Sequence, residues 1–169
     1  SSDLAMVPPA PPAAGADRGG LGAAMAFGAV LLFFFGLQQR DWRTDWSALG
    51  AAQAGLIQDG QWWRALTALT LHVDHGHLLG NLAAGLVFGL LVAQLLGAGL
   101  AWLAILLTGA LGNVLTAWLQ TPGHTAIGAS TALFGALGIV AGFLRQRRVV
   151  PWRGGIRRWA PLSAGILLL

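Results

Sequence analysis

The chain has 169 residues, of which 56% are hydrophobic and 9% are charged, and its formal net charge at pH 7 is +4. Because an ordinary soluble domain carries about a quarter charged residues, this composition excludes a water-facing surface of the usual kind. The absence of cysteine excludes disulfides and cysteine-ligated metals. Residues 75–144 contain no Asp, Glu, Lys or Arg, which leaves room for three helices of roughly 20 apolar residues each. We therefore predict an all-α fold, a polytopic transmembrane helical bundle.

The first segment, residues 1–20, is rich in Pro, Ala and Gly and is predicted to be a disordered N-terminal tail. We expect the membrane domain to cover residues 21–169, with a first span over 21–37. The next connection, residues 38–64, is polar and contains a group of tryptophans, namely Trp42, Trp46, Trp62 and Trp63. An indole ring is apolar but has an N–H to satisfy, so tryptophan favours the membrane interface. We expect this connection to lie there and to include short amphipathic helices.

Three further spans are predicted over residues 77–96, 100–119 and 130–143. A short uncharged turn separates the first two, and a Pro-Gly sequence at 122–123 interrupts the chain before the third. The span that begins at Ser130 is shorter than a full crossing, so we expect it to start below the membrane surface. Irregular backbone at that depth must be buried in protein or face water.

A fifth apolar segment begins near Pro161, and the sequence ends at Leu169. A helix that ended there would leave backbone carbonyl groups unsatisfied inside the bilayer. We therefore expect the natural protein to continue past Leu169.

Arginine is concentrated in one loop, since six of the ten basic residues lie between Arg145 and Arg158. By the positive-inside rule this loop is cytoplasmic, where it would contact the lipid bilayer rather than nucleic acid. Counting the spans back places the N-terminus in the cytoplasm and the loop before Ser130 on the outer side. The lack of Lys and the abundance of Ala, Gly and Leu favour a bacterial source, and hence the bacterial inner membrane.

Three polar side chains are conspicuous in the uncharged stretch. His77 and Asn81 are four positions apart near the start of one span and therefore share a helix face, whereas Ser130 opens another span. Neutral His and Asn can both donate hydrogen bonds, which stabilise a developing negative charge. A serine at a helix N-terminus lies beside free backbone N–H groups that favour an anion. The structural alternatives are hydrogen bonding between helices by His77 and Asn81, and N-capping by Ser130.

The ordered set of motifs resembles the rhomboid intramembrane serine proteases. The family has a Trp-Arg pair in its first outer loop, a run of two histidines and an asparagine at the second helix, and a Gly-x-Ser motif at the fourth. The matching residues are, in chain order, Trp63-Arg64, His72, His77 and Asn81 at the family's spacing, and Gly128-Ala129-Ser130 followed by Phe134. The resemblance covers residues 21–169, which is everything except the tail.

The resemblance implies that Ser130 is the nucleophile and that His77, Asn81 and the Ser130 backbone N–H form an oxyanion hole. It further implies that the site is supported by His72, Gly128 and Phe134. Trp63 and Arg64 are implied to be structural residues of the outer loop. The implied partners are transmembrane protein substrates, and the implied activity needs no cofactor.

Two departures from the family pattern affect these expectations. Thr131 stands where the family usually has Gly, and its branched Cβ would crowd the turn after the nucleophile. The family's general base is a histidine on a sixth helix, so about five spans are present of an expected six or more. The base would then lie beyond Leu169, and residues 1–169 alone are predicted to be inactive.

Other functions are weighed against this one. A metal site is disfavoured, because the histidines near His72 and His77 lack the His-Glu-x-x-His spacing of zinc peptidases and the chain contains no Glu. A non-proteolytic rhomboid-like protein that binds and escorts membrane proteins stays open as the alternative. So does a transporter fragment whose polar residues line a path, for which no internal repeat is found. The sequence predicts neither the substrate nor the oligomeric state.

Overall fold

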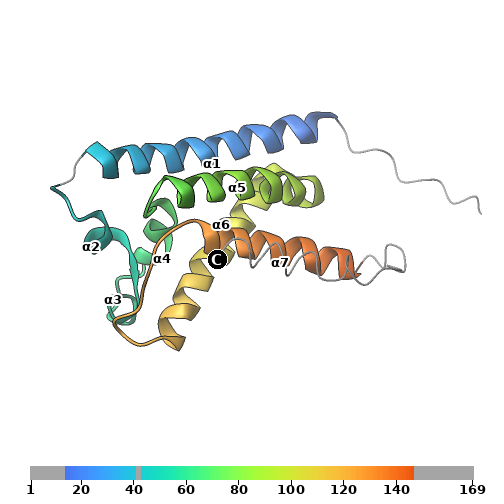
Figure 1. Cartoon of the computed structure of the whole chain (residues 1–169). Coiled ribbons are helices and arrows are strands. Elements are labelled where there is room, and N and C mark those ends of the chain that lie inside the picture. Colours follow the sequence, from blue (N-terminus) through green and yellow to red (C-terminus); the bar gives the residue numbers. More distant parts are fainter. Residues whose placement is uncertain (1–13, 41–42, 147–169) are drawn as a thin grey trace, which may run out of the picture.

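The computed structural model describes residues 14–40 and 43–146, and the backbone there is mostly helical (Figure 1). Long helices build the bundle, namely α1 (Ala14–Arg40), α5 (His75–Leu96), α6 (Ala98–Leu119) and α7 (Ser130–Gln146). Helices α1, α5 and α6 are long and apolar enough to cross a membrane, whereas α7 is apolar but shorter. The predicted all-α membrane bundle is therefore confirmed, while the predicted fifth segment lies outside the described residues.

Helix α5 begins two residues before the predicted start, because Asp74 caps its N-terminus. Asp74 is the N-cap, and its side chain accepts a hydrogen bond of 2.8 Å from the backbone N–H of His77. This bond satisfies one of the free N–H groups of the first turn, so the helix begins at His75 rather than His77. The turn before α6 is also tighter than predicted, because Gly97 alone, with φ of +78°, reverses the chain.

The N-terminal tail is shorter than predicted. Helix α1 begins at Ala14, so residues 14–20, which were predicted to belong to the tail, are helical, and residues 1–13 lie outside the described part of the chain. Gly20 is buried, and a Cβ atom added there would lie 3.1 Å from the Cβ of Ala93 on α5. In membrane helices small residues allow this kind of close approach. The Gly- and Ala-rich composition therefore serves helix packing.

The connection between α1 and α5 contains the predicted short helices. In chain order they are α2 (Trp46–Gly50), α3 (Ala54–Gln58), α4 (Arg64–Thr67) and the 3-10 helix η1 (Ala68–Thr70). Strand β1 (Ala52–Gln53) pairs antiparallel with β2 (Thr125–Ala126), with Ala52 opposite Ala126. This pairing ties the connection to the loop that leads into α7.

Buried polar side chains fix this connection on the bundle. Arg64 is buried and donates to the carbonyl oxygens of Ala48 at 2.8 Å and Ala51 at 3.1 Å, which positions α2. Asn113 of α6 is also buried, and its Nδ2 donates to the carbonyl oxygen of Ala65 at 2.9 Å. Since a buried polar group is costly without a partner, these bonds specify where α2 and α4 sit.

Helices α6 and α7 approach each other closely through glycines. Added Cβ atoms at Gly109, Gly112 and Gly135 would overlap side chains of the opposing helix. Gly138 and Gly142 lie four positions apart on α7, a spacing that would suit the close approach of another helix. An added Cβ at either position would meet nothing within 4 Å, so neither forms a close contact with the described residues.

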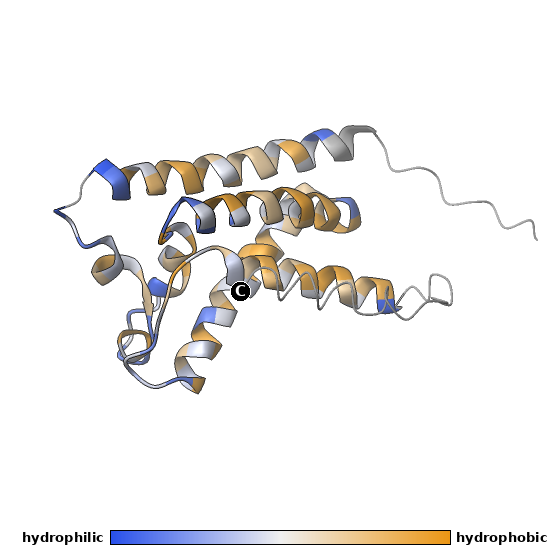
Figure 2. Cartoon of the chain, in the orientation of Figure 1, coloured by the Kyte–Doolittle hydropathy of each residue, from blue (hydrophilic) through white to orange (hydrophobic). Residues whose placement is uncertain are grey.

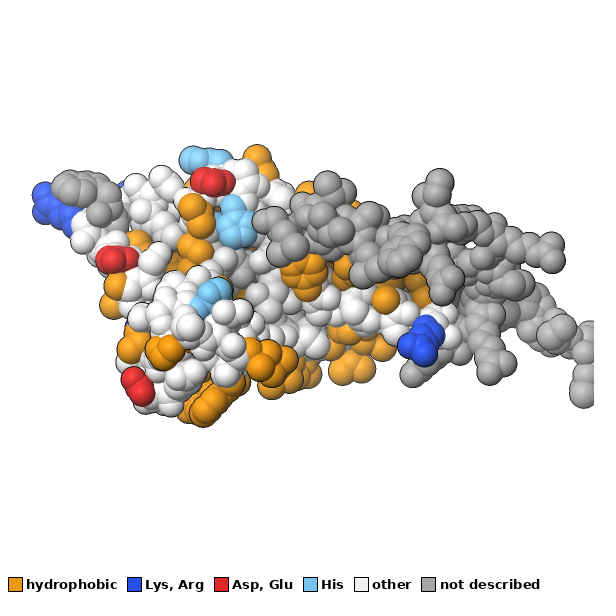
Figure 3. Space-filling model, turned by 60° about the horizontal axis from the view of Figure 1, so that its bottom comes forward, with side chains coloured by type: hydrophobic (Ala, Val, Ile, Leu, Met, Phe, Trp, Pro, Cys, Tyr) orange, Lys and Arg blue, Asp and Glu red, His pale blue; other side chains and the backbone are white. Residues whose placement is uncertain are grey.

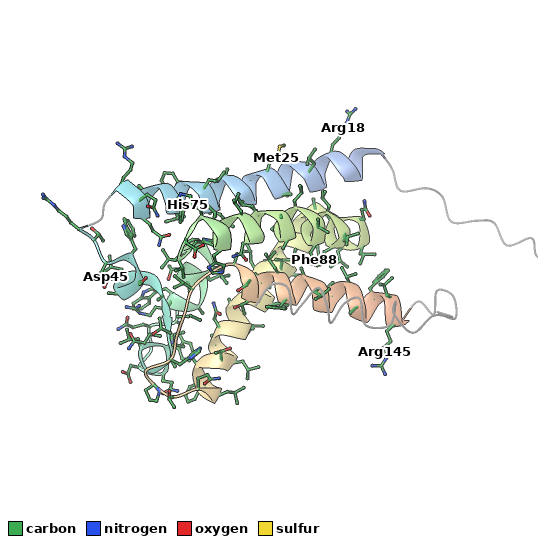
Figure 4. All side chains as sticks on the ribbon, viewed as in Figure 1. Arg18, Met25, Asp45, His75, Phe88 and Arg145 are labelled. Carbon is green, nitrogen blue, oxygen red and sulfur yellow. The ribbon has the colours of Figure 1, made fainter. Side chains whose placement is uncertain are left out.

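Polarity is distributed as expected for a bundle in a membrane. Apolar residues cover the long helices, and hydrophilic residues gather at the helix ends and in the connection (Figure 2). Arg18 and Arg145 lie towards one end of the bundle, and Asp45 lies at the other (Figure 4). The space-filling view shows histidine and acidic side chains at the end that carries the connection (Figure 3).

Candidate active site

The site is assembled where the N-termini of α5 and α7 meet. His77 lies in the first turn of α5 and is half-buried, and Ser130 is the first residue of α7. Between them lies Gly128, a buried residue with φ of +114°, whose backbone N–H donates to the carbonyl oxygen of Ala68 at 2.8 Å. This φ value favours glycine. The turn before Ser130 is thus fixed on η1.

The contact between His77 and Gly128 brings the two helices together. A Cβ atom added to Gly128 would lie 2.5 Å from Cε1 and 2.6 Å from Nε2 of His77, so the imidazole edge rests on the glycine backbone. Because Ser130 follows two residues later, the Nε2 edge of His77 is placed beside the start of α7. His77 and the turn that leads into Ser130 therefore lie side by side.

Ser130 is half-buried, and its hydroxyl has no hydrogen-bond partner among the residues that the structure describes. The preceding Ala129 is fully buried in a cluster with Leu31 and Phe35 of α1 and Leu78 of α5.

The backbone N–H groups of Ala132 and Leu133 donate to the carbonyl oxygen of Ala129 at 3.0 and 3.1 Å. Those of Ser130 and Thr131 precede these bonds at the start of α7, so they are available to a ligand at this point. An acyl group held beside Ser130 would meet both the hydroxyl and these N–H groups.

Asn81 lies one turn after His77 and is buried. Its Nδ2 donates to the carbonyl oxygen of His77 at 2.9 Å, and its Oδ1 is buried without a partner in the described structure. One amide proton is therefore used within α5, and the second stays available. The bond also restricts the orientation of the amide, because a carbonyl oxygen can only accept.

His72 supports His77 from the loop before α5. Its ring is buried, and the ring centroids of the two histidines are 5.2 Å apart. Its Nδ1 lies 3.3 Å from the carbonyl oxygen of Thr70, so Nδ1 carries the proton and Nε2, which has no partner in the described structure, is the acceptor. The pKa of His72 is lowered to about 4, mainly by burial and also by the nearby charge of His77, while the hydrogen bond to Thr70 acts in the opposite direction. His72 is therefore neutral at pH 7.

Phe134 and Thr131, the remaining residues singled out on α7, have fewer contacts with the site. Phe134 lies one turn after Ser130 and is half-buried, and no ring contact of Phe134 is found within the described ranges. Thr131 points its Cγ2 at α6, where a Cβ added to Gly112 would lie only 2.6 Å from it. The predicted crowding is therefore relieved, because Gly112 provides space for the threonine methyl. Within the described ranges no three His, Asp, Glu or Cys side chains gather closely enough to hold a metal ion.

Comparison with known proteins gives a family assignment. The profile of the rhomboid domain matches residues 59–168, which is more than half of the chain. The chain belongs to the rhomboid family. The resemblance drawn from the motifs is thereby confirmed, and the membrane-length helices make this rhomboid a multi-pass membrane protein of a family of intramembrane proteases.

Relatives from distant organisms share this part of the sequence. Rhomboid protease GluP of Bacillus subtilis is 35% identical over 111 residues, which are 64% of this chain and 22% of GluP. YdcA of Bacillus subtilis is 30% identical over 118 residues, 68% of this chain and 57% of YdcA. Rhomboid-like protease 3 of Toxoplasma gondii is 37% identical over 93 residues, 55% of this chain and 35% of that protein. The chain spans less than two thirds of each of these relatives. No solved structure gives a significant match.

Proposed function

We propose that this rhomboid is a serine endopeptidase that cleaves transmembrane segments of other membrane proteins. The observation that carries the proposal is the contact of the His77 Nε2 edge with Gly128, two residues before Ser130. The imidazole lies against the turn that leads into Ser130 and the N-terminus of α7, which supports a role for the imidazole, the serine hydroxyl and the N–H groups of the helix N-terminus in one site. Such preorganised donors stabilise the oxyanion of acyl transfer.

In the proposed reaction, Oγ of Ser130 bonds to the carbonyl carbon of the scissile peptide bond while its proton passes to a general base. The C–N bond then breaks, and the amine leaves with that proton. Water adds to the acyl-enzyme ester and gives a proton to the base, after which the carboxylic acid product and the serine hydroxyl are released. His77, the second amide proton of Asn81 and the Ser130 backbone N–H would bind the oxyanion.

The general base is proposed to be a histidine outside residues 1–169. Three histidines in the described structure have other contacts, since His72 packs beside His77, His77 rests on Gly128, and His75 meets the ring of Phe35 edge-on at 4.9 Å. Residues 1–169 alone are therefore expected to bind but not to hydrolyse a substrate.

We further propose that the site opens to the outer face of the bacterial inner membrane, with the N-terminus in the cytoplasm. Arg18 and Arg145 lie towards the end of the bundle opposite Asp45 (Figure 4), and in the sequence five more arginines follow Arg145 by residue 158. The other end has three arginines, Arg40, Arg43 and Arg64, so the positive-inside rule assigns the end with Arg145 to the cytoplasm. The N-terminus of α5, which carries His77, is at the end of the bundle that holds the connection (Figure 1). Water would reach Ser130 from that side.

The test uses the full-length protein in proteoliposomes with a membrane-anchored substrate. Ser130→Ala is expected to lower cleavage by at least about a thousandfold and to abolish labelling by a serine-directed phosphonate. Ser47→Ala is the matched control, because Ser47 is exposed on α2, and it should label and cleave normally. Cleavage by Ser130→Ala at the wild-type rate would refute the nucleophile. Stable binding of membrane proteins without labelling or cleavage by the wild type would favour the escort function.

A further inference from the structure

The end of α1 holds the loop that precedes α5 through one glutamine. Gln38 is half-buried, and its amide forms two hydrogen bonds with the backbone of His72. Its Nε2 donates to the carbonyl oxygen of His72 at 3.3 Å, and its Oε1 accepts from the backbone N–H of His72 at 3.1 Å. Because a backbone N–H can only donate and a carbonyl can only accept, the pairing also fixes the amide orientation. We call it the Gln38 clamp.

The Gln38 clamp acts where the loop has little other support. Residues 71–74 lie between η1 and α5, so the backbone of His72 has no partner within a helix or strand. The His72 side chain is buried but has a single polar contact, since Nδ1 lies 3.3 Å from the carbonyl oxygen of Thr70 and Nε2 has no partner in the described structure. The two bonds from Gln38 therefore fix the position of His72.

The position of His72 matters because His77 packs against it. The centroids of the two rings are 5.2 Å apart, and the imidazole of His77 also lies against Gly128. A shift of the His72 loop would release one support of the His77 imidazole. A displacement of about 1 Å in a catalytic donor is enough to lower the rate strongly.

We propose that Gln38 is a positioning residue of the active site, which holds His77 in place through the backbone of His72. This inference rests on the function proposed above and adds α1 to the elements that determine catalysis. Within the described residues, Gln38 forms its side-chain hydrogen bonds with His72 and none with Ser130 or Gly128. Its effect passes through the sequence of contacts from Gln38 to His72, then to His77, and then to the turn before Ser130.

The chain offers a matched control next to Gln38. Gln39 is exposed and has no hydrogen-bond partner in the described structure. Gln38→Met keeps the length of the side chain and removes both hydrogen bonds, whereas Gln39→Met makes the same chemical change without breaking a contact. Gln38→Glu is a third variant, because its carboxylate can accept from His72 but can no longer donate to it.

Two measurements on the full-length variants test the clamp. The first is kcat per serine labelled by the phosphonate, which does not depend on the unfolded fraction, together with KM. Gln38→Met is expected to lower kcat about tenfold with KM within about twofold, Gln38→Glu to fall between, and Gln39→Met to match the wild type. The second is hydrogen exchange of the backbone over residues 71–77, which should speed up in Gln38→Met only.

The outcomes separate this inference from the proposed function. If Gln38→Met has wild-type kcat per labelled serine, or unchanged exchange over residues 71–77, the clamp is not a positioning device. A lowered melting temperature with normal kcat per labelled serine would also refute it, because that result indicates a purely structural role. If the wild type itself neither labels nor cleaves, the proposed function fails, and unchanged exchange in Gln38→Met would still overturn the clamp.

Discussion

Replacing Gly128 by alanine should impair the site in two separable ways. The first is backbone strain, because φ of +114° is unfavourable for any residue with a Cβ and costs about 1–3 kcal/mol. The second is overlap, because the new Cβ would lie 2.5 Å from Cε1 of His77, whereas ordinary contact begins at 3.4 Å. The imidazole would have to move by about 1 Å, which is expected to lower kcat about a hundredfold.

Gly60→Ala isolates the first of these effects. Gly60 also has a positive φ of +97°, but nothing lies within 4 Å of an added Cβ, so this variant should lose stability and keep its activity. Both variants would be compared in the full-length protein by thermal unfolding and by kcat per phosphonate-labelled serine. Equal kcat values for Gly128→Ala and Gly60→Ala would refute the argument that His77 rests on Gly128 in the working enzyme.

Three further predictions follow from other contacts. Gly112→Ala should destabilise the protein by about 1–3 kcal/mol, since its Cβ would lie 2.6 Å from Cγ2 of Thr131, and adding Thr131→Ser should restore much of the loss in thermal unfolding. The pKa of His72 is lowered to about 4 in the folded protein, so the unfolded chain binds a proton more readily than the folded one. The contribution of neutral His72 to the free energy of unfolding is therefore complete above about pH 6.5, and it falls by at most about 3 kcal/mol as the pH is lowered towards 4. A His72→Gln variant should lack that part of the pH dependence of unfolding. Since residues 1–169 contain no cysteine, Ser47→Cys should be labelled by an impermeant thiol reagent from outside the cell and Arg145→Cys should not, and the reverse pattern would invert the proposed topology.

The spans could be predicted closely because their signal is local. A membrane helix needs a long apolar stretch, and residues 75–144 provide one without any charge. The helix over residues 14–20 was not predicted, because a Gly-rich segment can either be disordered or pack closely as a helix. In water glycine weakens a helix, but in a membrane bundle Gly20 lies against Ala93, where its missing side chain permits close packing. Composition alone does not separate these cases.

The polar residues of the site could be predicted from the sequence, but some of the residues that support the site could not. His77, Asn81 and Ser130 interrupt an apolar sequence, so their polarity marks them. Asn113 carries the same signal, since it is a polar residue in an uncharged span, and it was missed although it holds α4. Gln38 carried no such mark, because it sits at the polar end of α1 beside Gln39, and only the pairing with His72 distinguishes the two.

The sequence by itself determined the membrane class, the order of the spans and the family, since these depend on hydrophobicity and residue spacing along the chain. The tertiary structure decided that Thr131 fits into the space left by Gly112, that His77 rests on Gly128, and that α1 reaches the site through Gln38. Each of these joins segments far apart in the sequence. Such contacts depend on how closely two helices approach and on which side chains meet there, and neither is encoded in the pattern of one segment.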